Sequence, residues 1–351
     1  PYIYQFNLSI QRQITPNLLV DAAFVGSRVR SLPVNKSINY VPLNELQKGV
    51  AYLQQVVTNP FAGLLPGSGI NGATVQLQQL LAPYPQFSLT RGDGSATGGV
   101  TANSSPIGQS SFHSFQLRLE KRLSHGLTFI SSYMLSKNIE KNNFLNAQDT
   151  RLARQLTDFD RTHVWVFSGV AELPFGRGRR FAASLPGWLN HFVGGWRYVW
   201  IANIGTNRPQ DMPGGLEPLG LDPKVKNRNY DLWFNNCYIN LNSTLSPQCA
   251  ANNLQPAWRV RAPGELRTTP NRFSNIRRPL RPVFDMSLHK DIRIKERLRL
   301  EYRFETFNTF NSVIFDAPVT DYSNANFGKI PQPRAPIYFP RNLQMGLKLY
   351  F

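Results

Sequence analysis

Apolar and polar side chains alternate in many segments of the amino-acid sequence. From Tyr2 to Ile10 every even-numbered residue is apolar, and from Gln5 to Gln13 every odd-numbered residue is polar. Residues two apart share one face of a β-strand, whereas an α-helix repeats about every 3.6 residues. The alternation therefore predicts a strand at the start of the chain, with one apolar and one polar face.

The sharpest alternation lies in two segments near the end of the chain. Charged side chains occupy every second position of the first segment, at Arg299, Glu301, Arg303 and Glu305. The apolar side chains of the two segments are Leu298, Leu300, Tyr302 and Phe304 in the first and Leu343, Met345, Leu347 and Leu349 in the second. Helical spacing gives no apolar stripe in either segment, so both are predicted to be strands.

Weaker alternation of the same kind predicts further strands, to a total of about nine. These segments include residues 115–120, 127–135, 165–167, 196–200 and 284–288. A soluble β-sandwich also alternates in this way. However, the predicted strands reach about ten residues or more, whereas strands in soluble proteins usually have about 5–6. A tilted strand that crosses a membrane needs about 9–11 residues.

The predicted connections alternate between short and long. The shorter ones lie at residues 14–17, 124–126, 174–193 and 291–296. The longer ones lie at residues 31–111, 141–160, 207–279 and 311–340. Short periplasmic turns and long extracellular loops are typical of outer-membrane barrels. In a compact soluble domain, loops of this length would count against the strand assignment.

These patterns predict an all-β fold, an antiparallel transmembrane β-barrel in the bacterial outer membrane. A membrane-spanning sheet must close because unpaired backbone groups facing lipid cost on the order of several kcal/mol each. About nine strands is an odd number, whereas complete bacterial barrels have an even one. The chain also starts at Pro1, with neither an initiator Met nor a signal segment. We therefore expect residues 1–351 to be the C-terminal part of a larger barrel.

The membrane assigns the two faces of the predicted strands. A charge that faces lipid at mid-bilayer costs about 2–4 kcal/mol. We therefore expect the four alternating charged residues to face the lumen and the eight apolar residues named with them to face lipid. Within the lumen, the charges either contact a plug domain, line a solute path or form a ladder that solvates the interior. A last strand that ends at Phe351 is expected to end on the periplasmic side.

Composition narrows the class of protein further. The 351 residues are 41% hydrophobic and 12% aromatic but only 17% charged, too apolar for a disordered chain. No segment approaches the about 18 consecutive apolar residues of a transmembrane helix. The net charge of +18 is spread over several segments, including Arg277, Arg278 and Arg281, rather than gathered in one run. This distribution of charge disfavours nucleic acid as a partner and leaves a phosphate-rich membrane surface as the alternative partner of the positive charges.

The sequence contains little that indicates catalysis. No Gly-x-Ser-x-Gly or His-Glu-x-x-His motif is present, so we expect neither an enzyme nor a bound cofactor. Asp158, Asp160 and His163 are too few ligands for a metal and are expected to form a polar brace at the start of a strand, with Arg161 paired to Asp160. The only two cysteines, Cys237 and Cys249, lie in one Asn-rich segment. They are compatible with a disulfide in an oxidising compartment or with two free thiols.

Several motifs, in order along the chain, resemble those of Oar-like TonB-dependent receptors. They are FNLSIQR at 6–12, VGS at 25–27, LRLEKR at 117–122, YMLSK at 133–137, TDFDRTH at 157–163, ELPFGRGRR at 172–180, GGW at 194–196, FETFNTFN at 304–311 and LKLYF at 347–351. The resemblance implies a larger barrel filled by an N-terminal plug, with uptake energised through TonB. It also implies that the terminal Phe351 is a signal for the barrel-assembly machinery. The plug and the segment that contacts TonB are expected upstream of this chain.

Three hypotheses of function follow. The first is an outer-membrane receptor that imports a bulky solute such as an oligosaccharide, a peptide or a metal chelate, with lipid and lipopolysaccharide around it. The second is a surface or adhesin barrel that does not transport. The third is a soluble basic β-protein that binds polyanions. Arg177, Arg179 and Arg180 lie in a predicted periplasmic connection, where they either meet anionic lipid headgroups or form a solvated turn.

Overall fold

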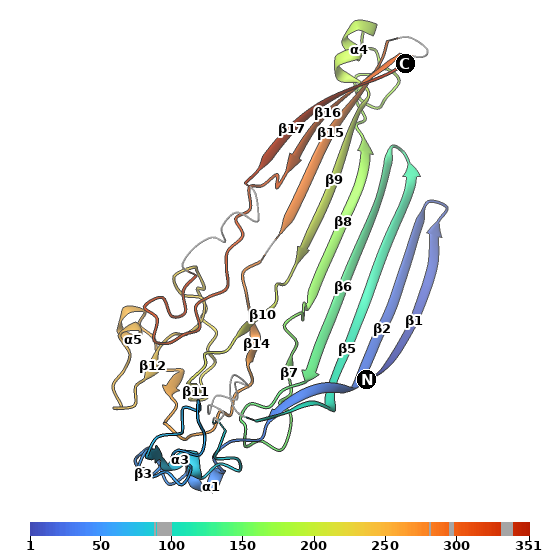
Figure 1. Ribbon diagram of the computed structural model, residues 1–351. Helices are drawn as coiled ribbons and strands as arrows, with labels where there is room; N and C mark the ends of the chain where they lie inside the picture. Colours follow the sequence, from blue (N-terminus) through green and yellow to red (C-terminus); the bar gives the residue numbers. More distant parts are fainter. Residues whose placement is uncertain (88, 90–99, 281, 295–297, 331–339) are drawn as a thin grey trace.

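A single curved sheet of long antiparallel strands dominates the computed structural model, which describes residues 1–87, 89, 100–280, 282–294, 298–330 and 340–351 (Figure 1). Nine strands follow one another in the order β1-β2-β5-β6-β8-β9-β15-β16-β17. Their bounds are β1 Tyr2–Thr15, β2 Leu18–Ser37, β5 Thr101–Ser124, β6 Leu127–Lys141, β8 His163–Glu172, β9 Trp196–Gly205, β15 Val283–Arg293, β16 Arg299–Phe307 and β17 Asn342–Tyr350. The short strand β7, Gln155–Leu156, pairs with β6.

The antiparallel register keeps the apolar residues of successive strands on one face. Leu8 lies opposite Phe24, which lies opposite Phe115 on β5. At the other end of the sheet, the row runs from Tyr198 through Leu288 and Phe304 to Met345. We call this face, which runs through all nine strands, the apolar face.

The apolar face is open rather than packed against a second layer. Leu8 is 70% exposed and Leu347 is 69% exposed. In a β-sandwich these side chains would fill a dry core between two sheets. The sandwich alternative is therefore wrong, and the all-β, antiparallel sheet of about nine strands is confirmed. The sheet does not close on itself, because β1 pairs only with β2 and β17 only with β16 among the described residues.

The pairing of β16 with β17 sorts the predicted lipid-facing and lumen-facing residues. Leu300, Tyr302 and Phe304 lie opposite Leu349, Leu347 and Met345, and Thr306 lies opposite Leu343. Arg299, Glu301, Arg303 and Glu305 lie on the other face, opposite Tyr350, Lys348, Gly346 and Gln344. Leu298 directly precedes β16. The two sets thus occupy opposite faces of the sheet, and their contact with lipid and lumen stays a prediction.

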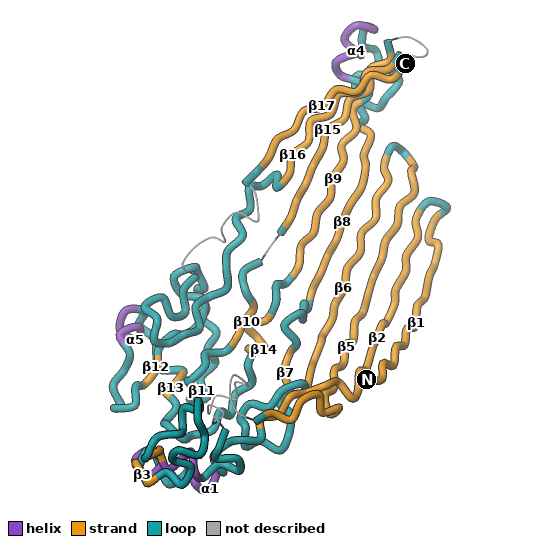
Figure 2. The backbone as a smooth tube through the Cα atoms, viewed as in Figure 1, coloured by secondary structure: helices purple, strands orange, loops and turns teal. Residues whose placement is uncertain are grey.

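Short and long connections separate to opposite ends of the sheet, as Figure 2 shows. At one end lie the turns β1–β2 and β5–β6, the end of β15, the start of β16 and the chain end at Phe351. The β8–β9 connection at this end carries the helix α4, Gly187–Val193. The described residues of the long loops 38–100, 142–162, 206–282 and 308–341 lie at the other end. We call these the turn end and the loop end.

The first long loop is shorter than the sequence predicts. Strands β2 and β5 have 20 and 24 residues, so they continue well past the predicted boundaries at residues 31 and 111. The register shifts between Arg30 and Leu32 and again between Val34 and Lys36, and Ser31 has a positive φ of 57°. Each bulge changes which residues face the same side, so the period of two is lost there although the pairing continues.

The loops contain short elements of their own. The first loop holds α1 Leu43–Leu46, α2 Val50–Leu53, β3 Val56–Thr58, β4 Thr74–Gln76 and α3 Leu77–Leu80. The loop 206–282 holds β10 Pro209–Asp211, β11 Leu216–Pro218, β12 Tyr238–Ile239, α5 Pro247–Ala251, β13 Trp258–Val260 and β14 Arg272–Arg277. None of the helices in the described part of the chain has the length and apolar character needed to cross a membrane. Arg281 lies outside the described residues.

The face assignment predicts different outcomes for two adjacent substitutions on β15. Leu288 lies on the apolar face between Tyr198 and Phe304, whereas Ser287 lies on the opposite face between Val199 and Glu305. Leu288→Arg should destabilise the assembled barrel by about 2–4 kcal/mol, because its charge faces lipid. Ser287→Arg serves as the matched control and should assemble normally.

The measurement is the fraction of full-length protein that reaches outer-membrane fractions in the folded, heat-modifiable form. A clear loss for Leu288→Arg alone is expected. Equal yields for the two variants, or a greater loss for Ser287→Arg, would contradict the face assignment.

Candidate functional site

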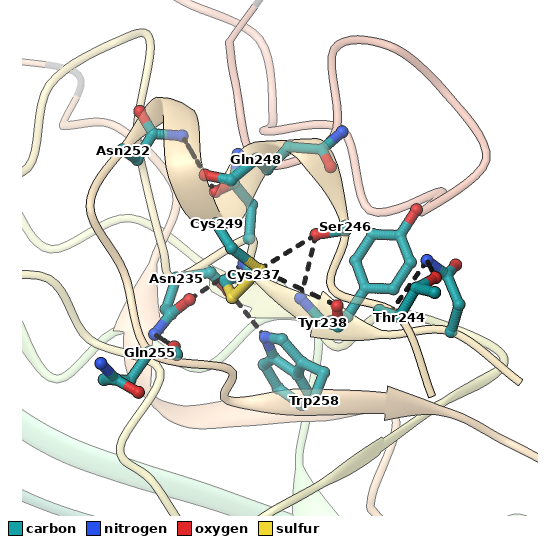
Figure 3. Close-up of a disulfide and its surroundings, with 12 residues drawn as sticks. Asn235, Cys237, Tyr238, Thr244, Ser246, Gln248, Cys249, Asn252, Gln255 and Trp258 are labelled. Atoms are coloured by element: carbon teal, nitrogen blue, oxygen red, sulfur yellow. Dashed lines mark hydrogen bonds between the residues drawn. A yellow bond between two sulfur atoms is a disulfide. The ribbon is translucent and has the colours of Figure 1, made fainter. Parts of the chain in front are cut away.

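A disulfide fixes the centre of the loop 206–282. Cys237 and Cys249 are joined across a separation of 12 residues, and both are buried (Figure 3). The hydroxyl of Ser246 lies 3.4 Å from the sulfur of Cys249. Below the disulfide, the indole Nε1 of Trp258 donates a hydrogen bond of 2.6 Å to the carbonyl of Asn235. Of the disulfide and the free thiols that the sequence leaves open, the structure contains the disulfide.

Two loops that are far apart in the sequence share one hydrophobic core beside this disulfide. Phe327 comes from the loop 308–341, and its ring lies 5.5 Å from that of Phe234 and 5.9 Å from that of Tyr238. Phe234 and Phe327 are fully buried. The remaining core members are Leu216, Trp233, Ala257, Trp258, Phe273, Ile276 and Ile330. The loop end therefore carries a folded unit, which we call the loop domain, rather than separate irregular loops.

A pocket of about 680 Å³ opens beside the loop domain. Its aromatic lining comes from Tyr230, Trp233 and Phe315, and the rings of Tyr230 and Phe315 stack at 3.9 Å. The guanidinium of Arg228 lies 4.3 Å above the ring of Trp233, and Lys224 completes the exposed basic rim. Flat apolar surfaces beside positive charges suit a solute that has both a ring or apolar part and a negative charge.

Two arginines in the pocket wall connect the loop domain to the turn that precedes β8. The guanidinium of Arg277 donates to the carboxylate of Asp160 at 2.5 Å and to the hydroxyl of Thr162 at 2.8 Å. Arg278 pairs with Asp211 at 2.9 Å and with Asp158 at 3.7 Å. Asp160 is only 1% exposed and also accepts a bond of 2.6 Å from the backbone N–H of Asn138.

These contacts correct one expectation for the acidic residues before β8. Asp158 and Asp160 lie in the turn just before that strand, where the brace was expected, but Asp160 pairs with Arg277 rather than with Arg161. The reason is that the side chain of Asp160 points inward from the turn. Arg277, which is 117 residues later in the sequence, forms the ion pair with it there. The Nδ1 atom of His163 is hydrogen-bonded to the hydroxyl of Tyr133 at 2.7 Å. No group of three or more His, Cys, Asp or Glu residues within the described segments is placed to hold a metal ion.

Acidic side chains also anchor the loops around the pocket. Arg272 pairs with Glu140 on β6 at 2.7 Å. In the same domain Glu265 accepts two hydrogen bonds from the guanidinium of Arg259, one of them at 2.7 Å. Arg259 lowers the pKa of the Glu265 carboxyl to about 2. This carboxylate therefore stays charged in all but strongly acidic solution, and the contribution of the pair to stability is lost only as the pH falls from about 4.5 through 2.

A second charged cluster lies on the polar face near the turn end of the sheet. Arg197 on β9 pairs with Asp291 on β15 at 2.6 Å and approaches Glu301 at 4.0 Å. Arg303 hydrogen-bonds to Glu301, which also accepts a bond of 3.4 Å from the hydroxyl of Tyr350.

The structure thus brings together three of the four predicted lumen-facing residues. Arg299 joins the cluster through Asp291 at 3.9 Å, whereas Glu305 lies farther along β16, opposite Ser287 and Gln344. The sequence did not indicate Arg197, because it lies between Trp196 and Tyr198 in a segment that attracts notice for its aromatics.

Comparison with known families decides the class of protein. A family model described as an outer membrane beta barrel domain matches residues 1–344. The chain belongs to this family. The protein is therefore located in the bacterial outer membrane, and the hypothesis of a soluble, polyanion-binding protein is wrong. No curated protein matches the sequence.

Solved structures of outer-membrane proteins show weak likeness to this barrel domain. The FrpB iron transporter from Neisseria meningitidis (F3-3 variant) shares 9% identity at a TM-score of 0.37. The outer membrane transporter YddB from Escherichia coli also shares 9%, at a TM-score of 0.36. Each match covers 99% of this chain but 31% of the other. The TodX monoaromatic hydrocarbon channel (deltaS2 mutant) shares 11% at a TM-score of 0.23, covering 99% and 60%. At these TM-scores, none of the three supports a conclusion about function.

The contact between Asp160 and Arg277 predicts a large effect of one substitution on the loop domain. Asp160→Asn removes the charge that Arg277 faces in a buried position, which should cost about 3 kcal/mol. The amides of the loop 206–282 should then exchange with solvent about 100-fold faster, measured by hydrogen–deuterium exchange on the folded full-length protein.

Asp158→Asn is the matched control, because Asp158 is partly exposed and its pairs with Arg208 and Arg278 should contribute about 1 kcal/mol or less. Equal protection in the two variants would show that Asp160 does not hold the loop domain to the sheet.

Proposed function

We propose that this chain is the C-terminal barrel portion of an Oar-like TonB-dependent receptor that imports a bulky solute across the outer membrane. The proposal rests on one observation: at its loop end, the barrel wall carries a folded domain with an open aromatic and basic pocket. A surface that captures a solute needs such an ordered, concave site, and the charged polar face of the sheet offers a hydrated wall beyond it.

The open edges of the sheet support a larger barrel. Within the described residues, β1 and β17 each have one edge without a strand partner. In lipid such edges are strongly unfavourable, so we propose that further strands and a plug complete the barrel. The charged cluster around Glu301 is the proposed contact of that plug, and Phe351, which is fully exposed, is the proposed signal for the barrel-assembly machinery. TonB would act on the plug, and lipopolysaccharide would surround the loop end.

We propose that the solute enters at the pocket of Arg228 and Trp233 and carries a negative charge. The positive charges of the rim are Arg228 and Lys224, neither of which has an ion-pair partner among the acidic residues that the structure describes. Arg277 and Arg278, by contrast, are occupied by Asp160 and Asp211. The stacked rings of Tyr230 and Phe315 offer a flat surface for an apolar part of the same solute.

Energised uptake is the decisive test of the proposed function. Spent medium from cells that express the full-length gene should lack specific solutes that a deletion strain leaves behind. Disruption of TonB should restore those solutes to the medium, because a closed plug blocks passage without energy. Mass spectrometry of the medium gives the readout. Depletion that continues without TonB, or no depletion at all, would favour the non-transporting surface barrel.

Substitutions in the pocket test the capture site once the depleted solute is known from that experiment. Arg228→Gln and Tyr230→Ala should each weaken retention of the solute by whole cells about 10-fold or more, through loss of charge or stacking, and Tyr230 is a lining residue that is 48% exposed. Lys226→Gln is the matched control, since Lys226 is an exposed cation of the same segment that does not line the pocket. Unchanged retention in the two pocket variants would exclude this pocket while leaving the transport proposal intact.

A further inference from the structure

The connection between β8 and β9 exposes large aromatic side chains at the turn end of the sheet. Trp188 is 67% exposed and Phe192 is 72% exposed, and because they are four residues apart they share one face of α4. Phe175 and Phe181, on the turn before the helix, are also exposed. Four exposed aromatic side chains in one short connection indicate an apolar or interfacial environment around it.

Two hydrogen bonds place α4 beside the apolar face. The indole Nε1 of Trp196 donates to the carbonyl of Phe192 at 2.8 Å, and the ammonium of Lys290 donates to the carbonyl of Gly194. Trp196 and Lys290 lie opposite each other, and Lys290 lies opposite Tyr302, so both donors belong to the apolar face. The end of α4 is therefore fixed below the lipid-facing side of the wall rather than below the lumen.

A basic turn is joined to the same helix. The backbone N–H of Arg177 donates to the side-chain oxygen of Asn190 on α4 at 2.7 Å. Gly176, at a φ of 117°, lets the turn come this close, because a Cβ there would lie 2.7 Å from the Cα of Gly194. The turn and the helix therefore form one unit, residues 173–195, which we call the turn-end anchor.

The charges of the turn-end anchor are arranged for a negatively charged surface. Arg179 pairs with Glu172 at 3.0 Å, and the guanidinium of Arg180 lies 5.5 Å from the ring centre of Phe181. Arg177 and Arg180 form no ion pair with the described acidic residues. Aromatic side chains at the level of the headgroups, with arginines beside them, are the pattern of interfacial binding to anionic lipid.

We infer that the turn-end anchor binds the periplasmic leaflet of the outer membrane and selects phospholipids with anionic headgroups. Trp188 and Phe192 insert at the headgroup boundary, while Arg177 and Arg180 contact the phosphates. The inference depends on the orientation of the barrel but not on transport, so it goes beyond the proposed function. A periplasmic protein on the same surface is the alternative that the experiment separates.

The experiment uses the full-length protein, folded and purified in detergent, with phosphatidylglycerol and phosphatidylethanolamine as probes. Native mass spectrometry measures how much of each lipid stays bound. The wild-type protein should prefer phosphatidylglycerol, and Arg177→Gln with Arg180→Gln should weaken that binding about 30-fold, since each interfacial arginine contributes about 5-fold. Arg122→Gln, an exposed arginine at the same end of the sheet, should leave it unchanged.

Two further measurements test whether the arginine variants still fold and whether Trp188 lies at the lipid. Arg177→Lys with Arg180→Lys keeps the charges and should keep the preference, which separates loss of charge from loss of fold. In vesicles of phosphatidylglycerol with brominated acyl chains, fluorescence quenching of the wild type should exceed that of Trp188→Ala, because the bromines quench Trp188. Equal binding of the two lipids, or quenching unchanged by Trp188→Ala, would overturn the inference and indicate a surface for a protein.

Discussion

Hydrogen bonding of the backbone within the bilayer is the constraint on which this structure depends. A strand in lipid has no water to satisfy its N–H and C=O groups, so neighbouring strands must satisfy them. The register of that pairing then decides the environment of every side chain, since a slip of one residue would reverse the faces. Here eight consecutive pairings keep the apolar residues on one face of the sheet, which includes Leu8 on β1 and Met345 and Leu347 on β17.

Sequence reasoning succeeded where this constraint acts. The period of two in the segments of β1, β16 and β17 predicted their positions and their two faces, because residues two apart share one face of a strand and the two faces differ in residue type. The same reasoning failed along β2 and β5 beyond residue 31. There bulges shift the register, so residues two apart no longer stay on one face of the sheet. The two strands stay paired there, but the alternation of apolar and polar residues that would predict the pairing is lost.

The loop domain could not be predicted in the same way. Its core joins Phe234 and Phe327, which lie on different loops and belong to no repeating pattern. Asp160 and its partner Arg277 are 117 residues apart. Nothing in the sequence around Asp160 shows that its ion-pair partner is Arg277 rather than Arg161, the next residue in the chain. The sequence limited Cys237 and Cys249 to one loop, yet only their approach in space selects the disulfide. Alternation of apolar and polar residues reveals a strand because each of its faces has one kind of environment. The loop domain instead depends on individual contacts between residues that are far apart in the sequence.

The shared core of the two loops has a mechanical consequence. One of these loops leaves β9 and returns at β15, and the other leaves β16 and returns at β17. Because Phe327 of the second is packed into the aromatic core of the first, the rim from β9 to β17 is clamped at a fixed circumference. Any widening of the mouth would therefore have to move these two loops together, and it would also have to move the first loop, between β2 and β5, because the backbone of Leu46 there lies against Gly264 of the loop domain.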